Sequence, residues 1–110
     1  MRVYISGPIS GCKDYKENFD RAEKTLRKQG FEVINPVSFE DLLPQLTYEE
    51  YMKIDLCLLD LSEAVYMLAG WQQSLGANRE YGYAQGKGLV IWEEEENDEK
   101  IPQENLTGVF

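Results

Sequence analysis

Four short apolar runs punctuate the chain, and each is bounded by glycine, proline or polar residues. Runs of this length that are rich in valine, isoleucine and aromatic residues are typical of buried β-strands. The second run ends at Asn35-Pro36, because proline cannot donate a hydrogen bond to a strand ladder. The predicted strands cover residues 2–5, 31–34, 64–68 and 89–92.

Between these runs the apolar residues recur every three or four positions, which is the spacing of an amphipathic helix. Two helical segments open with the sequence of a capping box, in which Asp14 is followed by Glu17 and Thr47 by Glu50. Gly30 supplies a stop signal for the first helix. The predicted helices cover residues 14–30, 47–61 and 75–85, and one further helical turn is expected near residues 39–43.

The alternation of strands and helices predicts parallel strand pairing with right-handed crossovers. We therefore expect an α/β fold, a three-layer Rossmann-like (flavodoxin-like) sandwich whose parallel sheet has four to five strands. A chain of 110 residues holds one such domain, expected over residues 1–92 and followed by an acidic C-terminal tail over residues 93–110. Ligands of such sheets bind at the carboxyl ends of the strands, where the loops after Ile5, Ile34 and Leu68 converge.

Composition narrows the class of protein. With 43% apolar and 28% charged residues the chain is expected to fold, and no apolar run approaches the roughly 20 residues that span a bilayer. Met1 leads directly into an apolar run without the pattern of a signal peptide. Cys12 and Cys57 stand alone, which disfavours a disulfide framework or a cysteine zinc site. We expect a cytoplasmic protein with no membrane partner.

The chain contains no histidine. Imidazole general bases are thereby excluded, as are Ser-His-Asp and Cys-His arrangements, and the commonest zinc ligand is missing. Chemistry must rest on carboxylates, tyrosines or lysines, and we expect neither a metal nor a cofactor. The net charge of −9 argues against a nucleic-acid partner, since that partner demands a basic face. Much of the charge is concentrated in residues 93–100, which hold six acids and one base.

Two acids interrupt the apolar faces of their predicted helices. The residues one turn before and after Asp55 are apolar or aromatic, and those around Glu80 are small or aromatic. A carboxylate in such surroundings must find partners or take up a proton. Two acids on separate core-facing helices suit glycosyl transfer or hydrolysis, where one attacks or stabilises the anomeric carbon and the other manages the proton of the leaving group. The pattern alone leaves open a boundary acid at Asp55 and a solvated glutamate at Glu80.

Other motifs carry weaker signals. The loop of residues 6–11 misses the spacing of a P-loop, and the glycines near the end of the third helix do not form a dinucleotide fingerprint. This loop still offers backbone amides and the Ser10 hydroxyl to an anion. Trp71 follows the third predicted strand, where it is placed to stack on a nucleobase, to pack in the core or to lie at a subunit interface.

Five segments form a specific pattern when they are taken together, and they are residues 3–11, 35–36, 55–56, 64–68 and 74–84. In these segments the chain resembles the nucleoside 2-deoxyribosyltransferase superfamily, which includes nucleotide N-glycosidases, and in particular its small bacterial and phage members. The most specific element is the sequence Glu80-Tyr81-Gly82-Tyr83-Ala84. The resemblance covers about residues 3–92 and leaves the acidic tail outside.

The resemblance implies roles for individual residues. Glu80 matches the nucleophile that attacks C1′ of the sugar, Asp55 matches a catalytic aspartate near the base and sugar, and Tyr4 matches a tyrosine that orients the nucleophile. Ser74 stands where the 5′-monophosphate hydrolases carry a phosphate-binding serine and the nucleoside transferases carry an aspartate. Further residues are expected to bind the substrate, and they are Gly7, Ile9, Ser10, Gly11, Gly76 and Trp71.

We therefore expect an enzyme that cleaves or transfers the N-glycosidic bond of a nucleoside 5′-monophosphate or a related nucleoside. One alternative is a catalytically silent module that binds or senses a nucleotide, and another is a structural partner protein that uses Trp71 and the tail. A homo-oligomer is expected, because a pocket at the strand ends would lie open to water unless another subunit covers it. The expected interface contains Trp71 and its neighbours together with Tyr48 and Tyr51.

Overall fold

The sheet of this protein has four strands, all parallel, in the order β2-β1-β3-β4. A computed structural model describes residues 1–95. Its strands are β1 (Arg2–Ser6), β2 (Glu32–Ile34), β3 (Ala64–Met67) and β4 (Val90–Glu93). Its α-helices are α1 (Tyr15–Lys28), α2 (Tyr48–Asp60) and α3 (Leu75–Lys87), and two 3-10 helices are η1 (Pro36–Leu42) and η2 (Trp71–Gln73).

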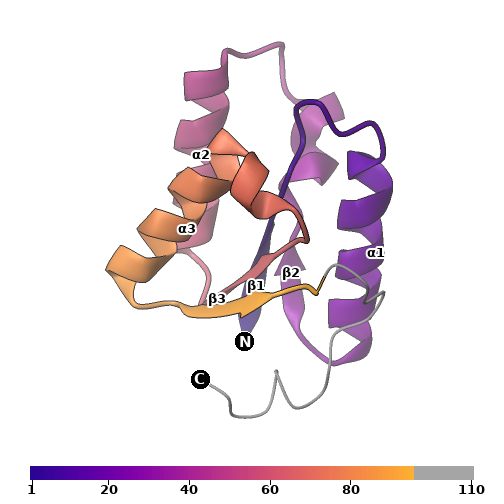
Figure 1. Cartoon of the computed structure of the whole chain (residues 1–110), viewed down its shortest axis with the longest axis vertical. Coiled ribbons are helices and arrows are strands. Elements are labelled where there is room, and N and C mark those ends of the chain that lie inside the picture. Colours follow the sequence, from indigo (N-terminus) through magenta and orange to yellow (C-terminus); the bar gives the residue numbers. More distant parts are fainter. Residues whose placement is uncertain (96–110) are drawn as a thin grey trace.

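Helices cover both faces of the sheet, with α2 and α3 on one side and α1 on the other (Figure 1). Side chains alternate between the two faces of a strand. In β1 this alternation sends Val3 and Ile5 into the core with Phe19 of α1, and Tyr4 into the core with Leu59 of α2. The predicted α/β class and the three-layer Rossmann-like arrangement are confirmed.

The two predicted capping boxes have different outcomes. Thr47 and Glu50 form both bonds of a capping box, from Glu50 N to Thr47 Oγ1 at 3.1 Å and from Thr47 N to Glu50 Oε1 at 2.8 Å. The box predicted at Asp14 is wrong, because Asp14 has φ −98° and ψ 18° and its side chain makes no cap hydrogen bond. Capping needs the extended backbone that Thr47 adopts and Asp14 lacks.

The segment after β2 is more ordered than the single turn predicted near residues 39–43. The 3-10 helix η1 already begins at Pro36, with the Asn35 side chain accepting a hydrogen bond from the amide of Val37 at 3.0 Å. Proline suits the first position of a helix because the missing amide would have no partner there. The pair Asn35-Pro36 therefore marks both the end of β2 and the start of η1.

The domain extends beyond the predicted boundary at residue 92. Glu93 is the last residue of β4, and the amide of Ala69 donates to Oε1 of Glu94 at 3.1 Å. Arg21 of α1 makes an ion pair with the same carboxylate at 3.4 Å. The first residues assigned to the acidic tail are thus part of the fold, and residues 96–110 lie outside the described part of the chain. Within residues 1–95, no helix combines the length and the apolar character needed to cross a membrane.

Candidate active site

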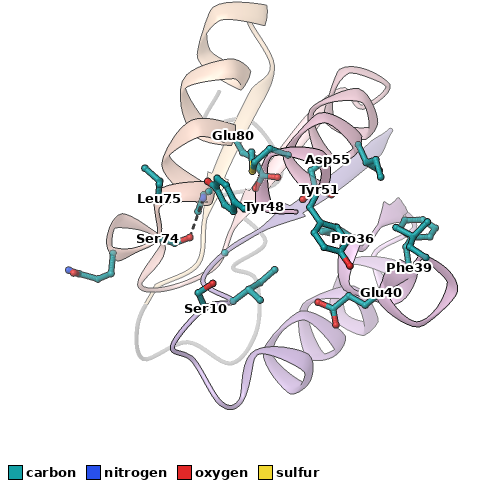
Figure 2. Close-up of a pocket in the computed structure, with 18 residues that line it drawn as sticks. Ser10, Pro36, Phe39, Glu40, Tyr48, Tyr51, Asp55, Ser74, Leu75 and Glu80 are labelled. Atoms are coloured by element: carbon teal, nitrogen blue, oxygen red, sulfur yellow. Dashed lines mark hydrogen bonds between the residues drawn. The ribbon is translucent and has the colours of Figure 1, made fainter. Parts of the chain in front are cut away.

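A cavity of about 620 Å³ opens among η1, α2, the start of α3 and the loop after β1 (Figure 2). It lies at the carboxyl ends of the strands, where the loops after β1, β2 and β3 converge as predicted. Its volume falls in the range of sites for small organic ligands. It is lined by Gly7, Ile9, Ser10, Pro36, Phe39, Glu40, Leu43, Tyr48, Tyr51, Met52, Ile54, Asp55, Gln73, Ser74, Leu75, Gly76, Ala77 and Glu80.

Glu80 is the most enclosed acid of this cavity, with 6% of its surface exposed. The hydroxyl of Tyr4 donates to its Oε2 and the hydroxyl of Ser6 donates to its Oε1, each at 2.6 Å. Tyr4 and Ser6 are two residues apart in β1, so both side chains leave the same face of the strand. The two donors fix both oxygens of the carboxylate, which is the arrangement needed to aim a nucleophile.

Two opposing effects set the charge of Glu80. The pKa of Glu80 is raised to about 7, chiefly by burial; the hydrogen bonds from Ser6 and Tyr4 act to lower it, and the charge of Asp55 acts to raise it. Burial beside these acids also raises the pKa of Tyr4 well above its usual range. Tyr4 therefore keeps its proton and remains a donor to Glu80.

Asp55 lines the same cavity from α2. Partial burial and, to a smaller extent, the charge of Glu40 together raise its pKa to about 6. A carboxyl group with such a pKa exchanges its proton near neutral pH, which suits general acid and base chemistry. The structure thus brings the two predicted catalytic acids, Asp55 and Glu80, to one site.

The N-terminus of α3 forms one side of the cavity. Ser74 is the N-cap of this helix, and its Oγ accepts a hydrogen bond from the amide of Ala77 at 3.2 Å. Its hydroxyl proton remains available to a ligand, as do the positive ends of the first peptide groups of the helix. Gly76 lines the wall next to Ser74, where an added Cβ would lie 3.5 Å from the Tyr48 hydroxyl.

The loop after β1 contributes three of its four predicted binding residues. Gly7, Ile9 and Ser10 line the cavity, whereas Gly11 does not and instead has the left-handed φ of 78° of a turn. A Cβ on Gly7 would lie 2.7 Å from the Cβ of Leu68. Close packing of this loop against the segment after β3 therefore requires glycine at position 7.

Trp71 does not line the cavity, which corrects its assignment to substrate binding. The residue is 8% exposed, and its ring stacks on Tyr81 of α3 with ring centroids 4.5 Å apart. Its indole nitrogen donates to Oε1 of Glu93 at 3.0 Å. The short η2 helix turns the ring inward, so Trp71 takes the core position that the sequence left open.

Several residues of the site were not predicted as functional. Ser6 could have been found, because it lies two residues after Tyr4 on the same face of a strand. Glu40 carries no such signal, since it lies in the 3-10 helix η1, whose path across the cavity depends on tertiary packing. It accepts a hydrogen bond from the Tyr15 hydroxyl at 3.0 Å. Phe39 adds an aromatic wall, and so does Tyr51, which was predicted at a subunit interface and not in the cavity.

Within residues 1–95, no group of three or more cysteine, aspartate or glutamate side chains is arranged to hold a metal ion. The polar groups that line the cavity include the hydroxyl-bearing side chains of Ser10, Tyr48, Tyr51 and Ser74 and the carboxyl groups of Glu40, Asp55 and Glu80.

The fold and the cavity define an α/β domain with a buried, hydrogen-bonded carboxylate in a ligand pocket at the ends of its parallel strands. Residues 1–93 match the model of a family described as a domain of unknown function (DUF4406), and the chain belongs to that family. None of the curated proteins matches the sequence.

Proposed function

We propose that this protein cleaves or transfers the N-glycosidic bond of a nucleoside 5′-monophosphate or a related nucleoside, with Glu80 as the nucleophile. The proposal joins the family resemblance of the sequence to the surroundings of Glu80. The observation that carries it is the carboxylate itself, buried, facing a ligand-sized cavity and held at both oxygens by Tyr4 and Ser6. A glutamate that served only packing would have no need to face an open cavity.

In the proposed reaction a carboxylate oxygen of Glu80 attacks C1′ of the sugar, and the bond from C1′ to the base nitrogen breaks. The electron pair of that bond leaves with the base. Asp55, or a water that it holds, supplies the proton that the departing base needs. Water or a second base then attacks C1′, gives up a proton to the deprotonated Asp55, breaks the bond from C1′ to Glu80 and gives net retention of configuration. Tyr4 and Ser6 position the nucleophile, and Ser74 binds the 5′ group through its hydroxyl and the helix N-terminus.

Glu80→Gln tests this proposal. Glutamine has nearly the same volume, and its oxygen accepts from one of the two hydroxyls while its NH2 group donates to the other, but its amide cannot act as the nucleophile. We expect the wild type to release free base from at least one nucleotide or nucleoside of a broad panel, measured by liquid chromatography. We expect Glu80→Gln to lose that activity by a factor of a thousand or more while keeping its thermal midpoint.

The matched control is Glu17→Gln, which makes the same change at an exposed position of α1, on the other side of the sheet. It should retain wild-type activity. Undiminished base release by Glu80→Gln would refute the role of Glu80. Ligand binding without base release by the wild type would refute the enzymatic proposal and favour a binding or sensing module.

A further inference from the structure

The cavity has two distinct sides. Glu80 lies in α3 and Ser74 is the N-cap of that helix, whereas Glu40 points into the cavity from η1 on the opposite side (Figure 2). In the proposed function the sugar lies at Glu80 and its 5′ group at Ser74. The base of the same ligand must then extend away from α3, toward η1. The residues around Glu40 are therefore the ones that the base would meet.

This far side is built for a flat, largely apolar ring with one polar edge. Pro36, Phe39 and Tyr51 lie beside Glu40 and supply apolar and aromatic walls (Figure 2). Aromatic walls bind heterocycles by stacking without selecting among the bases, because every base has a π-face. Selection among bases must come from a polar group at the ring edge, and Glu40 is the charged group that reaches the cavity from η1.

A hydrogen bond from a residue that does not line the cavity holds Glu40 in place. The hydroxyl of Tyr15, at the start of α1, donates to its Oε2 at 3.0 Å. An ionised carboxylate has about four acceptor positions, so this bond leaves Oε1 and one position on Oε2 for a ligand. Its charge also reaches Asp55, whose pKa it raises. Glu40 thus acts as a fixed anionic acceptor that faces the base.

We propose that Glu40 selects the base, and that the preferred base is a guanine-type purine, which presents two adjacent N–H donors on one edge. This inference rests on the proposed function, because it assumes that the sugar lies at Glu80. The ring N1–H and the C2 amino group of guanine match the two oxygens of a carboxylate in a paired, charge-assisted arrangement. Adenine and neutral cytosine place a ring acceptor beside their amino group, and this acceptor repels the carboxylate.

The test uses two ligands that differ only at this edge. 2′-Deoxyguanosine 5′-monophosphate has the C2 amino group and 2′-deoxyinosine 5′-monophosphate lacks it, while sugar and phosphate are identical. We expect calorimetric titration of the wild type to show about ten- to hundredfold tighter binding of the guanine nucleotide, the value of one hydrogen bond to a charged group. Glu40→Gln should lose this preference, because the amide replaces one acceptor oxygen with a donor. Tyr15→Phe should reduce it by a smaller factor.

Asp41→Asn is the matched control, because it removes the neighbouring negative charge at an exposed position that does not line the cavity. It should keep the wild-type preference. Equal affinity of the wild type for the two nucleotides overturns the inference, as does an equal loss for both in Glu40→Gln. If Glu40→Gln does not fold, the affinities of the wild type and of Tyr15→Phe for the two nucleotides still test the inference. Base release without a guanine preference overturns this inference alone, whereas guanine-selective binding without base release overturns the proposed function alone.

Discussion

Glu80 is held between two opposing influences, since burial favours its neutral form and two hydroxyl donors favour its charged form. The donors come from β1, so the position of the carboxylate is tied to an interior strand of the sheet and not to a loop. A group with a pKa of about 7 loses its charge within the range in which enzymes are assayed. The pH dependence of the reaction therefore reports the ionisation of Glu80.

We predict a bell-shaped dependence of kcat/KM on pH, with its maximum between pH 6 and pH 7. Glu80 must be ionised to attack, so the rate rises toward its pKa of about 7. Asp55 must be protonated to act as the acid, so its contribution falls above its pKa of about 6. The two acids interact, so the measured values belong to the pair.

Asp55→Asn is the informative variant for this profile. It should have a lower rate throughout and lose the decline at high pH, leaving a curve that rises to a plateau. An unchanged bell in Asp55→Asn would show that another group supplies the proton. A wild-type rate that falls continuously from pH 5 to pH 8 would contradict the role of ionised Glu80.

At the scale of single residues, the sequence predicted some residues of the candidate site and gave no signal for the contacts of others. Asp55 and Glu80 could be predicted because a carboxylate on an apolar helix face breaks a periodic pattern. Ser6 shares a strand face with Tyr4, which the sequence does show, but its bond to Glu80 depends on α3 approaching β1, which local pattern does not encode. The burial of Trp71 against Tyr81 likewise depends on how η2 and α3 pack. Long-range packing, absent from any short window of sequence, accounts for both.

Among the elements, the junction of β1 with its following loop sets the shape of the cavity. Gly7 lines the cavity, and a Cβ there would lie 2.7 Å from Leu68 Cβ, a distance that requires a backbone shift. We predict that Gly7→Ala lowers the free energy of unfolding by about 1–3 kcal/mol, the usual cost of overpacking. It should also weaken ligand binding, because the loop must move.

Gly82→Ala is the control for this change, measured in the same urea denaturation series. Gly82 lies in α3, and an added Cβ there would meet nothing within 4 Å. Alanine favours a helix over glycine by about 1 kcal/mol, so Gly82→Ala should be neutral or stabilising. Equal destabilisation by both substitutions would show that the contact with Leu68 is not the cause.

The elements themselves were the most predictable level of the structure. Runs of apolar residues and helical spacing gave four strands and three helices, since these patterns reflect burial of one face or both. Details at the ends of the elements were less predictable. The capping sequences at Asp14 and Thr47 look alike, yet only Thr47 has the backbone angles that let its side chain return to the helix. Such angles depend on how the preceding loop is packed.

At the scale of the whole molecule, the apolar surface is concentrated near the cavity. Five large hydrophobic side chains are exposed within residues 1–95, and among them Tyr48 and Leu75 line the cavity and Leu42 neighbours a lining residue. Exposed apolar side chains around a polar site are a feature of surfaces that another protein covers. Because Trp71 is buried, Tyr48 and Leu75 replace it as the expected centre of an interface.

We predict a homo-oligomer in which a second copy of the chain covers this rim. Light scattering at tens of micromolar should give a mass of at least twice 12.7 kDa for the wild type. Leu75→Ser should lower that mass toward the monomer. Leu61→Ser removes a similarly exposed leucine at the C-terminal end of α2 and should leave the mass unchanged. A wild-type mass near 12.7 kDa would contradict the prediction.

The central claim is that Glu80 forms a covalent bond to the sugar, and intact-protein mass spectrometry tests it most directly. A 2′-fluoro analogue of a substrate found in the panel destabilises the positive charge that develops at C1′, which slows the second step and lets the intermediate accumulate. We predict that the wild type gains the mass of the fluorinated sugar moiety while releasing one equivalent of base, and that peptide mapping places this mass on Glu80. Release of base with no adduct, or an adduct on another residue, would contradict the account.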